Sequence, residues 1–446
     1  MGPVDFANSV AGLAIESSKE GNKLRPGDRA VHDWYRFILS YPPHLVRTYV
    51  ERFGLSSGER MLDPFCGTGT TLVECKKLGI PSVGIEANPM AAFATRVKVN
   101  WKVDTPGLFR HAKAVARETI CKLESQGIDD SGGLPLFSKH SNNSVILKTL
   151  PQEMSKLLLR DSISALPLHK ALVLMETLEE NRDIRYYAHE RLALAKALVS
   201  GISNLEFGPE VGVGPPKRDA VVVASWLDAV GKMSDDIYAL KAARNVPASV
   251  HSGDSRCQSS LVEPCSIDAV ITSPPYPNEK EYTRTTRLES VLLGFIKSKQ
   301  DLRMLKKNLV RSNTRGVYKE DRDDLLVAHH TEIQRIADDI EKRRVELCKT
   351  SGFERLYARV TKLYFGGMAR HLSDLRGALR PGAQLAYVVG DQASYLRVMI
   401  RTGQLLSKIA VSLGYELVGI DLFRTRLATA TREHLREEVV VLRWPG

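Results

Sequence analysis

The sequence predicts an α/β fold in which an open, mostly parallel sheet is covered by helices on both faces. Two observations predict it. Short apolar runs that suit strands alternate with helical patterns between residues 43 and 100, and the same alternation returns after residue 354. Strands that alternate with helices pair in parallel through right-handed crossovers, so the carboxyl ends of the strands should meet at one edge of the sheet.

The first part of the predicted core spans residues 30–103. Its elements are, in order, the helix 43–53, the strand 60–62, the helix 71–78, the strand 81–86 and the helix 88–100. Pro43 suits a helix start because the first turn needs no amide donor there. A glycine-rich turn joins the first strand to the helix that follows it.

The core resumes in residues 247–295 and 354–446. We expect the strands 248–252 and 268–272, the helix 364–379, the turn 380–382, the strand 384–389, the helix 398–413 and the strands 415–423 and 437–444. Between the core parts lie a large helical insertion (104–246) and a smaller charged insertion (296–353). The helical insertion has helices at 167–179 and 186–200 and a Gly/Pro-rich loop at 207–218, and the segment 1–29 is a weakly patterned N-terminal arm.

The composition limits the possible partners and locations. A formal net charge of +11 favours a polyanionic partner such as nucleic acid, although the excess of Lys and Arg could also serve solubility. The six cysteines form no C-x-x-C pair, so we expect neither a metal site nor a disulfide framework. No run approaches the ~18 apolar residues of a membrane span, and no leader is visible, so a cytoplasmic location is expected.

The glycine-rich turn has the features of a cofactor-binding loop. Asp63-x-Phe65-x-Gly67-x-Gly69 lets the chain turn tightly and brings backbone amides close to a ligand. Glu86 ends the next strand, where an acidic residue can accept hydrogen bonds from a ribose diol. The G-x-G-x-x-G run of nicotinamide sites is missing, which disfavours hydride transfer, and a plain strand-to-helix turn remains an alternative.

The tetrapeptide Ser273-Pro274-Pro275-Tyr276 follows the strand 268–272. Two prolines remove two backbone donors and fix φ, which leaves rigid carbonyls as acceptors. Acceptors that hold the hydrogens of a ring-conjugated amine help its nitrogen become tetrahedral, and Tyr276 offers a flat face for a base. A Pro-Pro turn that merely ends a strand is the alternative.

These two motifs resemble those of amino-directed, S-adenosyl-L-methionine-dependent DNA methyltransferases. The resemblance implies a Rossmann-like class I methyltransferase sheet, S-adenosylmethionine as the cofactor and catalytic roles for residues 273–276. The serine form of the tetrapeptide is associated mainly with cytosine N4 methylation in that family. The resemblance also makes Tyr41 part of a cofactor-closing segment. The cofactor-binding residues expected from the loop and from the resemblance are Tyr41, Asp63, Phe65, Cys66, Gly67, Thr68, Gly69, Thr70, Thr71, Glu86, Asp254 and Ser255.

The expected substrate is double-stranded DNA with a flipped cytosine, in a prokaryotic, nucleoid-associated enzyme of a restriction-modification or related system. A cognate restriction endonuclease is a possible partner. Either insertion could read the DNA. The residues predicted to contact the base or the duplex are Asn278, Tyr282, Lys306, Lys307, Arg311, Arg315, Arg424 and Arg426.

Four other functions remain open from the sequence. They are adenine N6 methylation, RNA or protein amide methylation, carbon-5 cytosine methylation and a catalytically silent nucleic-acid-binding subunit. The carbon-5 reaction needs a nucleophilic cysteine after a proline, but Pro264-Cys265 precedes the strand 268–272 instead of ending it.

Overall fold

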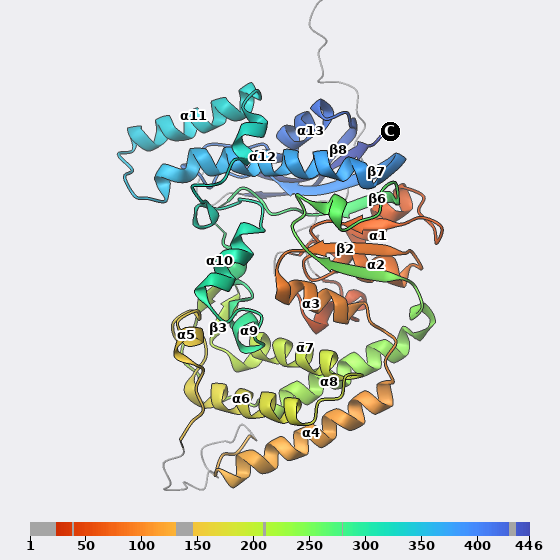
Figure 1. Cartoon of the computed structure of the whole chain (residues 1–446), viewed down its shortest axis with the longest axis vertical. Helices are drawn as coiled ribbons and strands as arrows, with labels where there is room; N and C mark the ends of the chain where they lie inside the picture. The colour runs from red at the N-terminus through yellow and green to blue at the C-terminus, as the bar shows by residue number, and fades with distance from the viewer. Residues whose placement is uncertain (1–23, 38–39, 131–145, 208–210, 279, 428–433) are drawn as a thin grey trace, which may run out of the picture.

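A seven-stranded sheet forms the centre of the computed structural model (Figure 1). The structure describes residues 24–37, 40–130, 146–207, 211–278, 280–427 and 434–446. The strand order across the sheet is β5-β2-β1-β6-β7-β9-β8. The strand bounds are β1 Met61–Asp63, β2 Ser82–Glu86, β5 Ala248–Ser252, β6 Ile267–Thr272, β7 Leu379–Gly390, β8 Glu416–Leu427 and β9 His434–Arg443.

The strand directions confirm the predicted Rossmann-like sheet. β1 pairs in parallel with β2 and β6, β2 with β5, and β6 with β7. β9 is antiparallel to both β7 and β8, so it alone runs against the other strands of this sheet. Leu62 of β1 lies opposite Val83 of β2 and Val270 of β6, and the carboxyl ends of these three strands therefore meet at one edge.

Both faces of the sheet are buried under helices. Met61 and Ala269 pack into a cluster with α1 (Pro43–Arg52), whereas their neighbours Leu62 and Val270 face the cluster that holds α12 (Tyr357–Leu375) and α13 (Thr402–Ser412). Successive side chains of a strand point to opposite faces, so a strand buried on both sides reads as a continuous apolar run. The prediction of helices on both faces is confirmed.

The helical insertion forms its own layer beside the sheet, joined to it through α2 (Thr70–Lys77) and α3 (Pro89–Lys98) (Figure 1). The buried Trp101 and Trp226 lie in the apolar cluster shared by this layer. Its elements are α4 Thr105–Ser125, α5 Gln152–Ser155, α6 Ala165–Glu180, α7 Tyr187–Ala197, η3 Leu198–Ile202, β3 Leu205–Phe207, β4 Val211–Val213 and α8 Val223–Ala239. The loop predicted at 207–218 is partly wrong, because β4 pairs with β3 inside it.

The charged insertion divides between two apolar clusters: Leu305 packs with the helical insertion, whereas the part from Val327 to Ile340 packs with α12. Ile333, Ile336 and Ile340 of α11 share an apolar cluster with α12 residues. Its elements are α10 Lys299–Lys307, η7 Thr314–Gly316, η8 Asp323–Val327 and α11 Thr331–Glu346, and the remaining helices are η1 Pro26–Asp28, η2 His32–Trp34, η4 Lys241–Ala243, η5 Gln258–Ser260, η6 Tyr282–Arg284, α9 Arg287–Leu292, η9 Glu354–Leu356 and η10 Arg376–Ala378.

Several predicted boundaries differ from the structure, most of all in the last part of the core. The helix predicted at 364–379 begins earlier, at Tyr357, and ends at Leu375. The turn predicted at 380–382 lies inside the long strand β7, where the amide of Gly382 donates to the carbonyl of Trp444. The helix predicted at 398–413 begins at Thr402, because Leu396 and Arg397 have positive φ and break a helical path.

Most of the predicted arm 1–29 lies outside the described residues. Its described end includes η1, and the Asp28 carboxylate pairs with Arg47 of α1 at 2.9 Å. Over the part of the chain that the structure describes, no helix is both long and apolar enough to cross a membrane.

Candidate functional site

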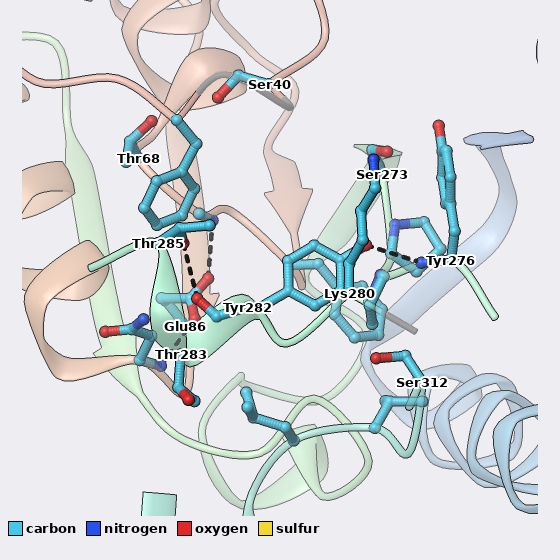
Figure 2. Close-up of a pocket in the computed structure, with 18 of the residues that line it drawn as sticks. Ser40, Thr68, Glu86, Ser273, Tyr276, Lys280, Tyr282, Thr283, Thr285 and Ser312 are labelled. Carbon is cyan, nitrogen blue, oxygen red and sulfur yellow. Dashed lines mark hydrogen bonds between the residues drawn. The ribbon is translucent and has the colours of Figure 1, made fainter. Parts of the chain in front are cut away.

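One cavity of about 520 Å³ lies at the carboxyl edge of the sheet, and both predicted motifs line it (Figure 2). Gly67 and Thr68 come from the loop after β1, and Ser273 to Tyr276 come from the loop after β6. Figure 2 shows Thr68 and Glu86 to one side, Ser273 and Tyr276 to the other, and Tyr282 between them. The prediction that these distant loops converge is confirmed.

The glycine-rich loop is held from behind. Gly67 and Gly69 have φ of +51° and +84°, and a Cβ on Gly69 would lie 2.6 Å from Cγ2 of Thr95. Thr95 Oγ1 donates to the Gly67 carbonyl at 2.8 Å, and Lys98 Nζ donates to the Thr68 carbonyl at 2.7 Å. Burial lowers the pKa of Lys98 to about 7. The loop carbonyls are thus satisfied on the protein side.

Asp63 positions the loops but does not line the cavity. Its Oδ1 accepts hydrogen bonds from Thr272 Oγ1 at 2.6 Å and from the amide of Phe65 at 3.1 Å, and its Oδ2 accepts from Tyr41 Oη at 3.0 Å. Burial raises the pKa of this carboxyl. Because Thr272 ends β6, Asp63 ties the first motif directly to the strand that carries the second.

Gly69 and Thr71 also lie behind the cavity wall. Thr71 Oγ1 donates to the carbonyl of Ile271 at 3.1 Å and contacts the hydroxyl of Tyr41. Asp63, Gly69 and Thr71 do not line the cavity, and Asp63 and Thr71 position the loops around it, so the cofactor contact predicted for these three residues stays a prediction. The other predicted cofactor residues line the cavity, namely Tyr41, Phe65, Cys66, Gly67, Thr68, Thr70, Glu86, Asp254 and Ser255.

Glu86, at the end of β2, faces the cavity and orders the adjacent backbone. Its Oε2 accepts the amide of Gly67 at 2.8 Å, and its Oε1 accepts the amide of Asn88 at 2.7 Å. Burial raises the pKa of this carboxyl to about 7. A carboxylate oxygen has two lone pairs, so each oxygen retains acceptor capacity for a ligand hydroxyl.

Asp254 is already engaged by a neighbouring cation. Its two oxygens accept a bidentate pair from Arg256, with Nη2 to Oδ2 at 2.7 Å and Nε to Oδ1 at 3.0 Å. Ser255 Oγ donates to the carbonyl of Pro64. Both residues line the cavity; Ser255 ties the loop after β5 to the start of the glycine-rich loop, whereas Asp254 is paired within its own loop.

The Ser273–Tyr276 loop presents oxygen acceptors. Ser273 Oγ donates its one hydrogen to the carbonyl of Val388 at 3.0 Å, so toward a ligand this oxygen can act only as an acceptor. The amide of Tyr276 donates to Tyr282 Oη at 3.1 Å. The Tyr276 ring lies against Gly390 of β7, where a Cβ would come within 3.0 Å of the ring's Cε2.

Several lining residues escaped the sequence analysis. The buried pair Tyr35 and Glu289 lies on the wall, and Gly390, which does not itself line the cavity, makes room for the Tyr276 ring. Both insertions also reach the cavity, the helical one through Lys196, Val199 and Phe207 and the charged one through Lys306, Val310 and Ser312. The aromatic run at 34–37 was the one available sequence signal, because an aromatic cluster before the first core helix suits a ligand cavity.

The predicted DNA contacts divide into buried and exposed residues. Arg311 is 4% exposed, and its guanidinium pairs with Asp321 at 2.9 Å and donates to three backbone carbonyls. It therefore braces its loop, and the DNA contact predicted for it stays a prediction, since Arg311 also lines the cavity. Asn278 is also buried, and its Oδ1 accepts the amide of Lys280 at 2.9 Å. Tyr282 lines the cavity.

Four of the other predicted DNA contacts have acidic neighbours, and the fifth, Lys307, lies near an aromatic ring. Lys306 pairs with Glu281 at 2.6 Å, and Arg424 pairs with Glu437 at 2.6 Å. The side chains of Arg315 and Arg426 are 43% and 42% exposed, each at 3.6 Å from a carboxylate. Lys307 Nζ lies 5.5 Å from the ring centre of Tyr318.

Fold and site together define a class of protein. A parallel sheet with a glycine-rich loop after β1, an acid at the end of β2 and a ligand-sized cavity at the strand ends is typical of Rossmann-like nucleotide-cofactor enzymes. The cavity fits S-adenosylmethionine, because Glu86 offers acceptors for a ribose diol and Phe37 and Phe65 offer apolar surface. The site therefore suits a methyltransferase of the class I fold.

Comparison with known proteins makes this more specific. Residues 15–94 match the family model of N6/N4 DNA methylases. The type II methyltransferase M.BsoBI of Geobacillus stearothermophilus is 27% identical over 93% of this chain and 84% of its own length. M.AvaI of Nostoc sp. (strain PCC 7120) is 24% identical over 96% of this chain and 88% of its own length. A tRNA (guanine(10)-N2)-dimethyltransferase of Methanothermobacter thermautotrophicus is 36% identical over 19% of this chain and 24% of its own length.

These matches confirm the resemblance to amino-directed DNA methyltransferases of the N4/N6 type that the two motifs predict. They also confirm S-adenosylmethionine as the cofactor that this type of enzyme uses.

Proposed function

We propose that this protein transfers a methyl group from S-adenosylmethionine to the exocyclic N4 amine of a cytosine flipped out of duplex DNA. The observation that carries the proposal is the single cavity lined by both the glycine-rich loop and the Ser273–Tyr276 loop. Because β1 and β6 are adjacent parallel strands, a donor held by the first loop and an amine held by the second can be aligned.

The Ser273–Tyr276 loop is suited to hold an amine. The Pro274 carbonyl and Ser273 Oγ would each accept one of the two amine hydrogens. Ser273 can accept because its own hydrogen is committed to the Val388 carbonyl at 3.0 Å. Acceptors fixed at this point favour the tetrahedral nitrogen of the transition state over the planar amine of the free base.

The cofactor, when bound, supplies an electrophilic methyl group on a sulfonium. The residues around it supply alignment, and no covalent link to the protein is needed. The Tyr276 ring, fixed between the cavity and Gly390, would stack on the flipped base. Stacking is worth about 1–3 kcal/mol per base and offsets the few kcal/mol that base extrusion costs.

The DNA would approach over the rim of the cavity. Among the cationic residues predicted to contact DNA, Arg315 and Arg426 have side chains that are 43% and 42% exposed. Each lies 3.6 Å from a carboxylate. Cations on such a rim suit phosphate contacts, which set orientation without reading sequence. Since both insertions reach the cavity wall, we propose that they share target recognition.

The choice of cytosine rests on the serine of the tetrapeptide. A serine hydroxyl is a weaker acceptor than a carboxylate, and in amino-directed enzymes this form goes mainly with cytosine N4. The carbon-5 alternative has little support, since Cys265 is exposed before β6 and does not line the cavity. The extent of the similarity to M.BsoBI and M.AvaI favours a role in a restriction-modification system.

The test is methyl transfer from radiolabelled S-adenosylmethionine to duplex DNA, followed by nucleoside analysis. N4-methylcytosine is the expected product. N6-methyladenine would replace the cytosine assignment, and label found in RNA alone would replace the DNA assignment. A protein that binds neither cofactor nor its product would be a silent subunit. Protection of the methylated DNA from a partner endonuclease would test the restriction-modification role.

A further inference from the structure

Glu289 is a buried carboxyl on the cavity wall with one oxygen that has no partner. The residue lies on the short helix α9, is 0% exposed and lines the cavity. Its Oε1 accepts a hydrogen bond from Tyr35 Oη, while its Oε2 has no hydrogen-bond partner among the described residues. A buried polar atom without a partner is costly, so its retention beside a cavity indicates a ligand.

Two contacts place Glu289 on the cofactor side of the cavity. The carbonyl of Tyr35, whose hydroxyl bonds Glu289, accepts from Lys98 Nζ at 3.2 Å, and the same Nζ donates to the Thr68 carbonyl of the glycine-rich loop at 2.7 Å. Thr286, one turn before Glu289, accepts through its Oγ1 from Asn88 Nδ2 at 3.0 Å, just beyond Glu86. Tyr35, which bonds Glu289, is thus tied to the glycine-rich loop, and Thr286, on the same segment as Glu289, is tied to Asn88. Glu289 lies between these ties on the cavity wall.

The charge around Glu289 indicates which kind of ligand group it can bind. No ion pair to Glu289 is found within the described part of the chain, and burial raises the pKa of its carboxyl to about 7. The titratable group that bonds Glu289 is the Tyr35 phenol, a neutral hydrogen-bond donor that leaves the carboxylate charge uncompensated. A cationic ligand group would stabilise the ionised carboxylate in this dry environment.

We propose that Glu289 binds the α-ammonium group of the methionine end of S-adenosylmethionine, with Tyr35 as its positioning residue. This inference rests on the proposed function, since it requires the cofactor in this cavity. The amino-acid end of the cofactor carries a primary ammonium, and the single free oxygen of Glu289 matches one such donor. The ribose would then lie toward Glu86, and the sulfonium would face the Ser273–Tyr276 loop.

The test compares two probes by isothermal titration calorimetry with the full-length protein. S-adenosylhomocysteine carries the amino-acid end, whereas 5′-methylthioadenosine shares the nucleoside and thioether but lacks it. Glu289→Gln keeps the shape and should weaken S-adenosylhomocysteine binding about tenfold, because it removes a charge-assisted hydrogen bond, while leaving methylthioadenosine binding unchanged. Tyr35→Phe should weaken the first probe by a smaller factor. Glu346→Gln, on the exposed surface of α11, is the matched control.

Each outcome separates this inference from the proposed function. If the wild-type protein binds neither probe, the proposed function fails. If it binds S-adenosylhomocysteine and the Glu289→Gln variant binds it equally well, only the role of Glu289 fails. Equal loss of both probes would mean that Glu289 supports the fold of the site, and a change confined to the KM for DNA would mean that it faces the base. Either result overturns the inference, and retained methylthioadenosine binding shows that the variant is folded.

Discussion

The glycine-rich loop after β1 and the Ser273–Tyr276 loop after β6 face the same cavity with opposite backbone polarity. In the first loop, Thr95 and Lys98 occupy the carbonyls of Gly67 and Thr68. In the second, two prolines carry no amide hydrogen, and Ser273 donates to β7. One loop is therefore short of free acceptors and the other short of donors. Under the proposed function, the lack of donors in the second loop suits an amine there, and Glu86, which accepts the Gly67 amide, supplies the acceptors on the cofactor side.

Tyr276→Ala should have the largest effect, and it should act on one side of the cavity alone. Loss of the ring removes the stacking surface and the alignment of the base, so kcat/KM for DNA should fall about a hundredfold. The affinity for S-adenosylhomocysteine, measured by calorimetry, should stay within about threefold of wild type, since the mutated side chain belongs to the acceptor loop. The exposed Tyr238→Ala, on α8, is the control. A parallel loss of cofactor affinity would contradict the division between the loops.

Glu86→Ala should produce the converse pattern. The change removes the acceptors expected to hold the ribose diol and frees the amides of Gly67 and Asn88, so the Kd for S-adenosylhomocysteine should rise about thirtyfold. Glu86→Gln keeps one acceptor oxygen, so its Kd for S-adenosylhomocysteine should lie between those of Glu86→Ala and the wild-type protein. DNA binding, measured by fluorescence anisotropy without cofactor, should not change. Weakened DNA binding in both variants would show that the two sides are coupled.

The sequence predicts the features that short local patterns define. The parallel strands and the convergence of the two motifs follow from apolar runs and βα alternation, which local spacing encodes, whereas the strand order was not predicted. Side-chain contacts that form only in the folded chain were missed. Arg311 reads as a surface cation, but it is buried and its guanidinium pairs with Asp321. Asp63 reads as a ligand contact, and the sequence does not show that Thr272, from another strand, donates to it.

The misplaced boundaries have a similar cause. The helix predicted at 398–413 begins late because residues 396 and 397 take positive φ and Ile400 bridges Gln392, a backbone path that apolar spacing does not report. Glu289 escaped for the same reason, since its partner Tyr35 lies far away in the chain. Burial and pairing between segments are set by tertiary contacts, whereas the motifs are set by neighbours in sequence.

Gly390→Ala tests how tightly the acceptor side is fitted. A Cβ there would lie 3.0 Å from Cε2 of Tyr276, so the ring must shift by a few tenths of an ångström toward the cavity. We expect kcat to fall about tenfold, with little change in the Kd for S-adenosylhomocysteine. Gly377→Ala, where an added Cβ meets nothing within 4 Å, is the matched control. Unchanged turnover in Gly390→Ala would mean that the Tyr276 ring can move without consequence.

Arg426→Ala should have the smallest effect, because it changes the rim and neither loop. The side chain is 42% exposed and only loosely paired with Glu437, at 3.6 Å, so it is available to a phosphate. Loss of one phosphate contact should weaken DNA binding about threefold to tenfold at moderate salt and reduce the slope of log K against log salt by about one. The comparison is Arg443→Ala, which ends β9 opposite Gln384 of β7, six residues before the carboxyl end of β7 at Gly390 and so away from the cavity. Equal slopes of log K against log salt for these two variants would mean that the DNA does not contact this rim. A lower slope for Arg426→Ala, with unchanged kcat, would mean that the duplex lies beside the cavity and that neither loop is needed for this contact.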